Sequence, residues 1–68
     1  MYKITTTQNG FIFNSIEYNF EGENEVISES QVLIGTNDGL ILLDLSCTIN
    51  DSTYTDINLF VEALKTNG

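Results

Sequence analysis

The chain carries one thiol, Cys47, three residues after the carboxylate of Asp44 in the apolar run GTNDGLILLDLSCTIN, residues 35–50. A thiolate beside a base or a cation could act as a nucleophile in group transfer. On a continuous strand, however, residues three apart point to opposite faces, so these two side chains could not cooperate. The sequence also lacks histidine and arginine, which could stabilise a thiolate. We therefore expect Cys47 to be a buried packing group, as unpaired cysteines generally are.

Carboxylates offer a second kind of chemistry, and they are densest at Glu17, Glu21, Glu23, Glu25 and Glu29. A glycosidase-type pair of carboxylates needs a cleft and environments that separate the two pKa values, for which a chain of this size has little room. A weak divalent-cation contact at Glu21, Glu23 and Glu25 is an alternative to a plain solvated loop. We expect no catalytic and no metal-binding residue, and keep these three glutamates as candidates for a protein interaction.

A third motif, NDG at residues 37–39, resembles the glycine corner of a calcium-binding loop. Ile34 and Thr36 occupy positions where that loop places ligands, so the match fails. Neither Gly35 nor Gly39 belongs to a phosphate-binding loop, because no strand-to-helix turn with a lysine follows. The motif predicts a hairpin turn at residues 36–39, and the sequence implies no cofactor.

The charge balance narrows the class of partner. Ten acidic residues stand against two basic ones, Lys3 and Lys65, which gives a formal net charge of −8 at pH 7. Contact with a phosphate backbone needs Lys and Arg to displace counterions, so we expect no direct nucleic-acid binding. Anionic membranes are disfavoured for the same reason. A basic protein partner, mimicry of nucleic acid, or solubility alone would each explain the charge.

The length of 68 residues predicts a single small domain, residues 1–68, with a thin core. Cores of this size contribute about 3–5 kcal/mol and are often reinforced by disulfides, metals or partner subunits. One cysteine cannot form an internal disulfide, and no Cys and His set suits structural zinc. Self-association or a protein partner is the remaining source of stability.

No targeting segment is evident in this sequence. The first ten residues, MYKITTTQNG, lack the apolar core of a signal peptide, and no apolar stretch approaches the roughly 20 residues that span a bilayer. We therefore expect a protein made in the reducing cytoplasm, with no membrane contact. The glycosylation triplet at residues 50–52 is of a kind that often occurs by chance.

The elements that position these residues begin with a predicted hairpin. Residues 2–7 are rich in β-branched side chains and lead into Asn9-Gly10, a pair suited to a type I′ turn. Residues 11–20 would form the return strand. Its mixed alternation predicts either two covered faces or a bulge at Asn14-Ser15.

The next segments predict a loop and two further strands. Residues 21–24 are polar and charged, as in an exposed loop, and residues 26–34 predict one interrupted strand. Residues 40–49 predict a strand buried on one side, with Leu40 and Leu42 as apolar exceptions on the other side. Its inward face would hold Ile41, Leu43, Leu45, Cys47 and Ile49.

The apolar period then changes to that of a helix over about residues 55–66. Thr55 would be the N-cap, with Asp56 favoured by the helix dipole. Tyr54 and Leu59 would form a hydrophobic staple across the cap. The apolar face of this helix would contain Ile57, Phe60, Val61 and Leu64. Together the elements predict an α+β fold, a small antiparallel β-meander of about four strands and two hairpins over residues 2–50, packed by one C-terminal α-helix.

Two hypotheses for function follow, and neither is enzymatic. The first is a structural or assembly module whose apolar residues Phe11, Phe13, Leu40 and Leu42 complete a surface against copies of itself or a larger partner. The alternative is that these four residues finish an intramolecular core. The second hypothesis is an acidic inhibitor or regulator that mimics nucleic acid toward a basic partner.

In composition, with abundant Thr, Asn, Ser and Ile, and in its predicted hairpins followed by a short helix, the chain resembles the small accessory proteins of phage particles. This resemblance lies in composition and element order. It implies, for the first hypothesis, an accessory role in a larger assembly such as a virion.

Overall fold

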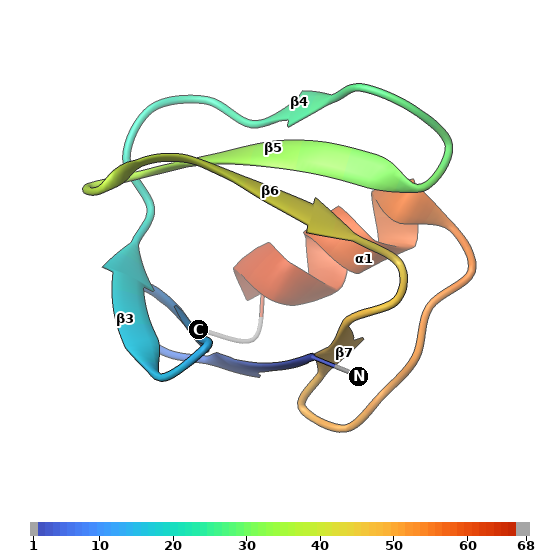
Figure 1. Cartoon of the computed structure of the whole chain (residues 1–68), viewed down its shortest axis with the longest axis horizontal. Coiled ribbons are helices and arrows are strands. Elements are labelled where there is room, and N and C mark those ends of the chain that lie inside the picture. The colour runs from blue at the N-terminus through green and yellow to red at the C-terminus, as the bar shows by residue number, and fades with distance from the viewer. Residues whose placement is uncertain (1, 67–68) are drawn as a thin grey trace.

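The computed structural model describes residues 2–66, which form seven strands and one C-terminal α-helix (Figure 1). The α+β class is confirmed, but the strands outnumber the four predicted and are divided between two sheets. Their bounds are β1 Lys3–Thr6, β2 Gly10–Phe13, β3 Ile16–Asn19, β4 Glu25–Val26, β5 Gln31–Thr36, β6 Gly39–Asp44, β7 Thr48–Ile49 and α1 Ile57–Thr66.

Sheet A contains four strands in the order β3-β2-β1-β7. The pairs β1–β2 and β2–β3 are antiparallel, as in a meander. The β1–β7 pair is parallel, with Lys3 opposite Thr48 and Ile4 opposite Ile49. The prediction of a single antiparallel meander is therefore wrong. The parallel pairing joins segments more than 40 residues apart, so the local alternation of apolar and polar residues gives no sign of it.

The loop between β1 and β2 is centred on residues 8–9, because the backbone N–H of Thr7 donates to the carbonyl of Gly10 (2.9 Å). Gly10 is itself the first residue of β2, without a positive φ angle. The predicted type I′ turn at Asn9-Gly10 is therefore wrong in position by one residue and wrong in type, because Gln8, Asn9 and Gly10 all lack the positive φ angles that a type I′ turn requires.

A turn with positive φ angles at both central residues does occur, at Asn14 (φ 57°) and Ser15 (φ 67°). It joins β2 to β3, so the predicted single strand over residues 11–20 is two strands. Neither a bulge nor two covered faces explains the mixed alternation: the chain reverses, and Phe11 lies opposite Tyr18 across the hairpin.

Sheet B contains three strands in the order β4-β5-β6, all antiparallel. The predicted interrupted strand over residues 26–34 is instead a hairpin, in which Val26 lies opposite Val32. The predicted turn at residues 36–39 is confirmed. Gly39 has a φ of +98°, and the Thr36 hydroxyl both donates to the Gly39 carbonyl (2.7 Å) and accepts from Asp38 N–H (3.1 Å).

The predicted strand over residues 40–49 is shared between the two sheets. It bends at residues 45–46, after which β7 pairs with β1 in sheet A. The prediction that these five residues face inward is confirmed despite the bend. Leu43, Cys47 and Ile49 are buried, while Ile41 and Leu45 are partly buried against the core.

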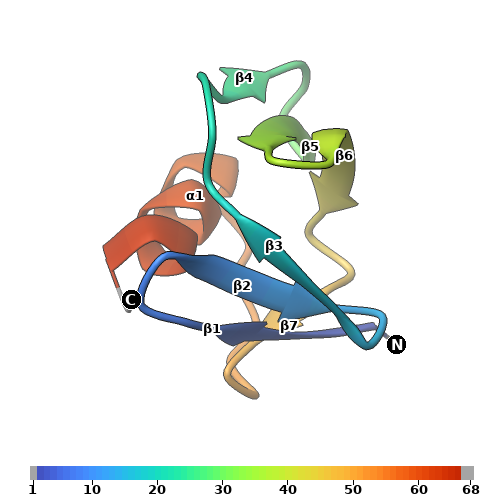
Figure 2. The same ribbon diagram turned by 90° about the vertical axis from the view of Figure 1, so that its left-hand side faces the viewer.

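Helix α1 lies between the two sheets on one side of the molecule (Figures 1 and 2) and contacts β2, β5 and β7. Its predicted apolar face is largely confirmed, since Ile57, Phe60 and Leu64 are buried and Val61 is partly buried. The fully buried core draws on both sheets and the helix, and its largest members are Phe11, Phe60, Ile4, Ile34, Leu43, Ile49, Leu64 and Val32.

The helix starts at Ile57, two residues after the expected start. Its N-cap is Asp56, whose carboxylate accepts hydrogen bonds from the N–H groups of Asn58 (2.8 Å) and Leu59 (3.4 Å). The assignment of Thr55 as N-cap is wrong, because Asp56 takes that place and satisfies two free donors of the first turn.

The staple partner shifts with the cap. Leu59 is 56% exposed, and Tyr54 instead packs edge-on against Phe60, with ring centroids 6.2 Å apart and an interplanar angle of 89°.

Candidate functional site

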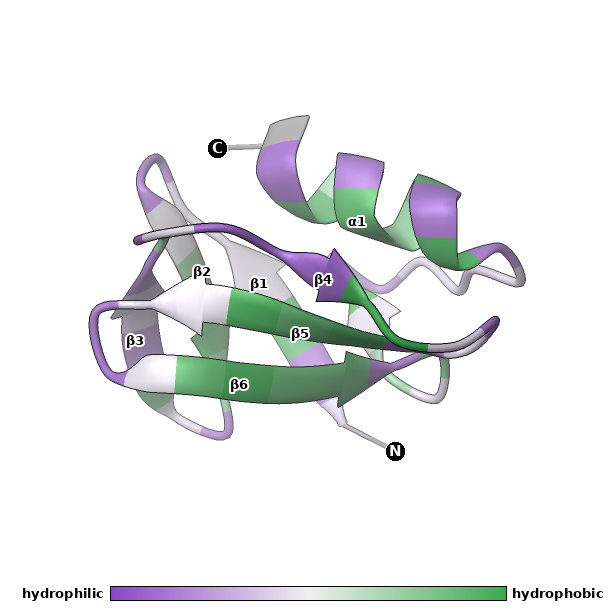
Figure 3. Cartoon of the chain, turned by 90° about the horizontal axis from the view of Figure 1, so that it is seen from above, coloured by the Kyte–Doolittle hydropathy of each residue, from purple (hydrophilic) through white to green (hydrophobic). Residues whose placement is uncertain are grey.

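The outer face of sheet B, the side turned away from the core, carries the two most exposed apolar side chains of this sheet, and both lie on β6. Along β6 alternate residues differ sharply: Leu43 is 1% exposed, whereas Leu40 and Leu42 are 66% and 50% exposed. Partly buried Leu33 on β5 lies directly opposite Leu42. We call Leu33, Leu40 and Leu42 the β6 patch. Figure 3 shows the hydrophobic colouring running along β5 and β6 on this side of the molecule.

The backbone of β6 is also open on one side. Within residues 2–66, β6 pairs with β5 along one edge and has no strand partner along the other. Figure 3 shows β6 forming the border of sheet B. An exposed edge presents unpaired N–H and C=O groups, and natural edges are usually protected by proline, lysine or a very short strand. The sequence of β6, GLILLD, contains no proline and no lysine, and the strand is six residues long.

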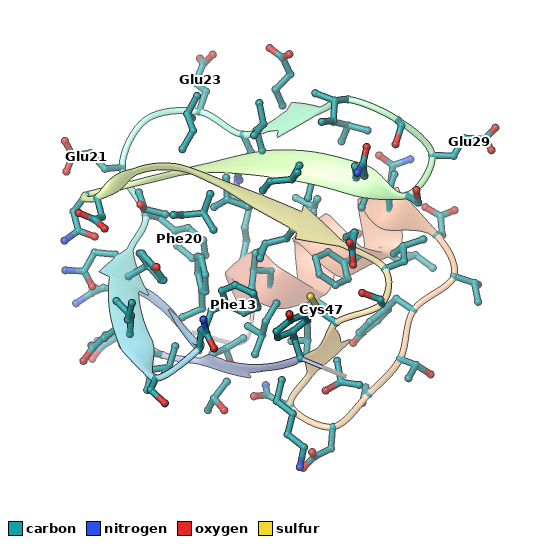
Figure 4. All side chains as sticks on the ribbon, viewed as in Figure 1. Phe13, Phe20, Glu21, Glu23, Glu29 and Cys47 are labelled. Atoms are coloured by element: carbon teal, nitrogen blue, oxygen red, sulfur yellow. The ribbon has the colours of Figure 1, made fainter. Side chains whose placement is uncertain are left out.

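The phenylalanines proposed with these leucines lie elsewhere. Phe11 is 0% exposed, and its ring packs against those of Tyr18 and Phe20 with centroids 5.3 and 5.7 Å apart. Phe13 is partly buried and contacts the ring of Tyr2 at 5.8 Å. Figure 4 shows Phe13 and Phe20 between the two sheets. Phe11 is therefore a core residue, and its assignment to the interaction surface is wrong. Phe13 packs against the core and is not part of the exposed face of sheet B.

The predicted exposed loop precedes β4, and with the first residue of β4 it forms the acidic loop, residues 21–25. Glu21, Glu23 and Glu25 are all exposed, and Figure 4 shows Glu21 and Glu23 pointing away from the sheets. The loop backbone is nonetheless attached to β5: Glu21 N–H donates to the carbonyl of Gly35 (3.0 Å), and Gly35 N–H donates to the side-chain oxygen of Asn24 (3.2 Å).

Gly35 permits this close approach. A Cβ at this position would collide with the Glu21 carbonyl oxygen and lie 2.8 Å from the Glu23 carbonyl oxygen. Within residues 2–66 no three Cys, Asp or Glu side chains are placed together so as to hold a metal ion. The acidic loop therefore contributes negative charge to the site, and its hydrogen bonds to β5 keep that charge close to sheet B.

Charge is unevenly distributed between the two sheets. Residues 21–44, which include all of sheet B, contain six acidic residues and no basic residue. Lys3 lies in β1 of sheet A, with its ammonium 3.7 Å from the Asp51 carboxylate at a well-exposed position. Lys65 lies in the last turn of α1. Sheet B and its loops are thus uniformly acidic.

The expectation that Asp44 and Cys47 cannot meet is wrong, because it assumed a continuous strand. The bend at residues 45–46 lets Cys47 N–H donate to the Asp44 carbonyl (3.2 Å) and brings the thiol 4.0 Å from the Asp44 carboxylate, which also accepts from Ser46. Burial raises the pKa of the Cys47 thiol and outweighs the backbone hydrogen bond at Asp44, which lowers it, while the Asp44 charge has a smaller raising effect. A buried, protonated thiol is a poor nucleophile, as the residue types alone had suggested.

An open pocket of about 310 Å³ lies beside the start of α1. One of its two carboxylates, Asp56, is engaged in capping the helix. The pocket contains no nucleophilic Cys or Lys. Its lining consists of Glu29, Thr55, Asp56, Ile57 and Asn58.

Comparisons of the chain with protein-family models, with curated proteins and with solved structures find no match. Among the described residues, α1 is the only helix, and it is too short to cross a membrane. The geometry and charge of sheet B are therefore the features on which a function can be proposed.

Proposed function

We propose that this chain is a non-enzymatic assembly module that binds another protein through the outer face and free edge of sheet B. The observation that carries the proposal is the coincidence, on one strand, of two leucines at least half exposed and an unpaired backbone edge. Contiguous exposed apolar surface is uncommon on proteins that act alone and is typical of interaction sites. An edge strand adds directional hydrogen bonds to that apolar contact.

An accessory component of a larger complex, such as a phage particle, is the most concrete form of this function. Its support is the compositional resemblance together with the small core, which a partner would reinforce. The module would be made in the cytoplasm and incorporated into the particle during assembly.

The test is site-specific photo-crosslinking in the producing cell. A benzophenone amino acid at position 42, in the β6 patch, should yield a discrete cross-linked product. The same probe at position 59 is the matched control, because Leu59 is similarly exposed (56% against 50%) but lies on α1. Equal products from both positions, or none at position 42, would contradict the proposal.

A second candidate function is an acidic inhibitor that mimics nucleic acid toward a basic protein. The six acidic residues and absent basic residues of residues 21–44 favour it. Such an inhibitor would displace a DNA fragment from its target, and added salt would abolish the effect, because exposed charges are screened over about 8–10 Å at moderate salt. An assembly contact based on the β6 patch would retain part of its affinity in high salt, since apolar burial is not screened.

A further inference from the structure

We propose that the free edge of β6 receives an extended segment of a basic partner protein as a fourth strand of sheet B. The segment would carry apolar side chains at alternate positions and Lys or Arg near its ends. This inference rests on the proposed function, and it names the mode of binding and the chemistry of the partner.

The length and exposure of β6 suit strand addition. Its six residues extend about 20 Å, enough to pair with a segment of similar length. An added strand continues the outer face of the sheet, so every second side chain of the segment would lie beside Leu40 or Leu42. Burial of these two side chains would supply apolar contact, and the unpaired backbone groups of β6 would set the register.

Charge selects the chemistry of the segment. Asp38 immediately precedes β6 and Asp44 is its last residue, so an acidic residue lies at each end of the strand, and the Asp44 carboxylate also accepts hydrogen bonds from Ser46. The acidic loop increases the negative field on the same half of the molecule. Lys or Arg flanking an apolar segment would meet opposite charge at both ends, which favours binding and orientation.

The same charges disfavour a second copy of this chain as the occupant. Edge-to-edge pairing of two β6 strands would bring together two acidic segments, each with six carboxylates and no lysine or arginine over residues 21–44. Like charges placed across paired strands are destabilising. The occupant is therefore a basic segment of another protein.

The experiment uses the full chain and a synthetic peptide, acetyl-Lys-Lys-Val-Thr-Val-Thr-Val-Lys-Lys-amide, followed by backbone amide NMR. The expected result is saturable shifts concentrated at residues 39–44, with affinity that falls about tenfold between about 50 mM and 300 mM salt. A peptide with Glu in place of each Lys tests the charge. A peptide with N-methyl groups on the residues whose N–H would face β6 tests the backbone pairing, and both should bind at least about tenfold more weakly.

A double variant, Leu40→Thr with Leu42→Thr, introduces β-branched residues that favour the strand and removes the two exposed leucines of the β6 patch, so it should weaken peptide binding severalfold. Ile12→Thr, on the outer face of sheet A, is the matched control and should bind as the wild-type chain does. The amide spectrum of each variant reports whether its fold is retained.

Four outcomes of the peptide experiment would overturn the inference: no saturable binding, saturable shifts centred away from β6, equal binding of the Glu peptide, or equal binding of the N-methylated peptide. If the chain instead dimerises through β6 in sedimentation experiments, the second copy is the occupant. A specific cross-link from position 42 together with a failed peptide would leave the proposed function standing and reject strand addition alone.

Discussion

The two sheets pack on the same helix, yet they protect their surfaces differently. Sheet A places its aromatic rings inward, and its two edges are the two-residue β7 and the four-residue β3, which carries one half-exposed apolar residue, Ile16. Sheet B has one similarly short edge, the two-residue β4, while its other edge is six-residue β6 with two leucines turned outward. A short edge is a weak template for pairing, whereas a long, unprotected one is a strong template. The longest free edge and the two most exposed strand leucines therefore both lie in sheet B, which is why we propose the interaction surface there.

The different arrangement of the two sheets also explains why the sequence prediction placed a core residue in the interaction surface. Phe11 and Leu40 both stood out as surplus to one clean face, but Phe11 lies inside a hairpin whose turn occurs at Asn14-Ser15. Leu40 lies on the outer side of a hairpin whose inner side is already supplied by Ile41 and Leu43. Whether an apolar residue lies in the core or on the surface thus depends on the position of the turn, which decides the side of the sheet on which its side chain lies.

The largest test of this contrast compares a core ring in sheet A with an exposed leucine in sheet B. Phe11→Ala should lower the free energy of unfolding by about 3–5 kcal/mol, because it opens a cavity among buried rings, and this approaches the whole stability of so small a fold. Leu40→Ala should change it by about 0.5 kcal/mol or less. Urea unfolding followed by circular dichroism measures both. Similar losses for the two variants would remove the distinction between the sheets.

The next test concerns how the acidic loop is held on sheet B. Gly35→Ala should lower the free energy of unfolding by about 1–3 kcal/mol, because the new methyl group collides with backbone carbonyls that cannot move freely. The effect should be accompanied by loss of amide protection at Glu21, whose N–H bonds to Gly35. Glu25→Ala, at an exposed position nearby, is the control and should be nearly silent. An unaffected Gly35→Ala variant would mean that the loop is not packed as described.

A smaller effect is expected at the helix that joins the two sheets. Asp56→Ala should cost about 1 kcal/mol, since it removes the acceptor for two N–H groups of the first turn, whereas Thr55→Ala should cost only a few tenths. Because α1 contacts β2 and β5, hydrogen exchange should become faster in both sheets of Asp56→Ala. Faster exchange in one sheet alone would show that the sheets open independently, and a larger effect from Thr55→Ala would reassign the cap.

The smallest effect concerns pH. The raised pKa of Cys47 means that the folded chain keeps the thiol proton at pH values where the unfolded chain has lost it. The free energy of unfolding should therefore decrease as pH rises above the ordinary thiol pKa of about 8.5. Cys47→Ala lacks this contribution, so the stability difference between the two proteins should shift in favour of the variant between about pH 7 and pH 10. Parallel stability curves over this range would contradict the burial of the thiol.

Part of the candidate site followed from sequence and part did not. Leu40 and Leu42 were singled out because they broke an alternation, and the three glutamates because they clustered. The free edge of β6 had no such signal, because strand order depends on which segments pair across long separations in the chain. The contact between Asp44 and Cys47 was missed because a bend at residues 45–46 replaced the continuous strand that the alternation suggested.

By itself the sequence determined the elements whose signals are local: the helix from its apolar spacing, the hairpin at residues 36–39 from its turn residues, and the inward facing of Leu43, Cys47 and Ile49. These outcomes depend on side chains a few residues apart. The tertiary structure alone decided that one predicted strand serves two sheets, that β1 pairs in parallel with β7, and that β6 ends as an open edge. The physical reason is that backbone pairing across distant segments is chosen by the packing of the whole core, which no short window of residues contains.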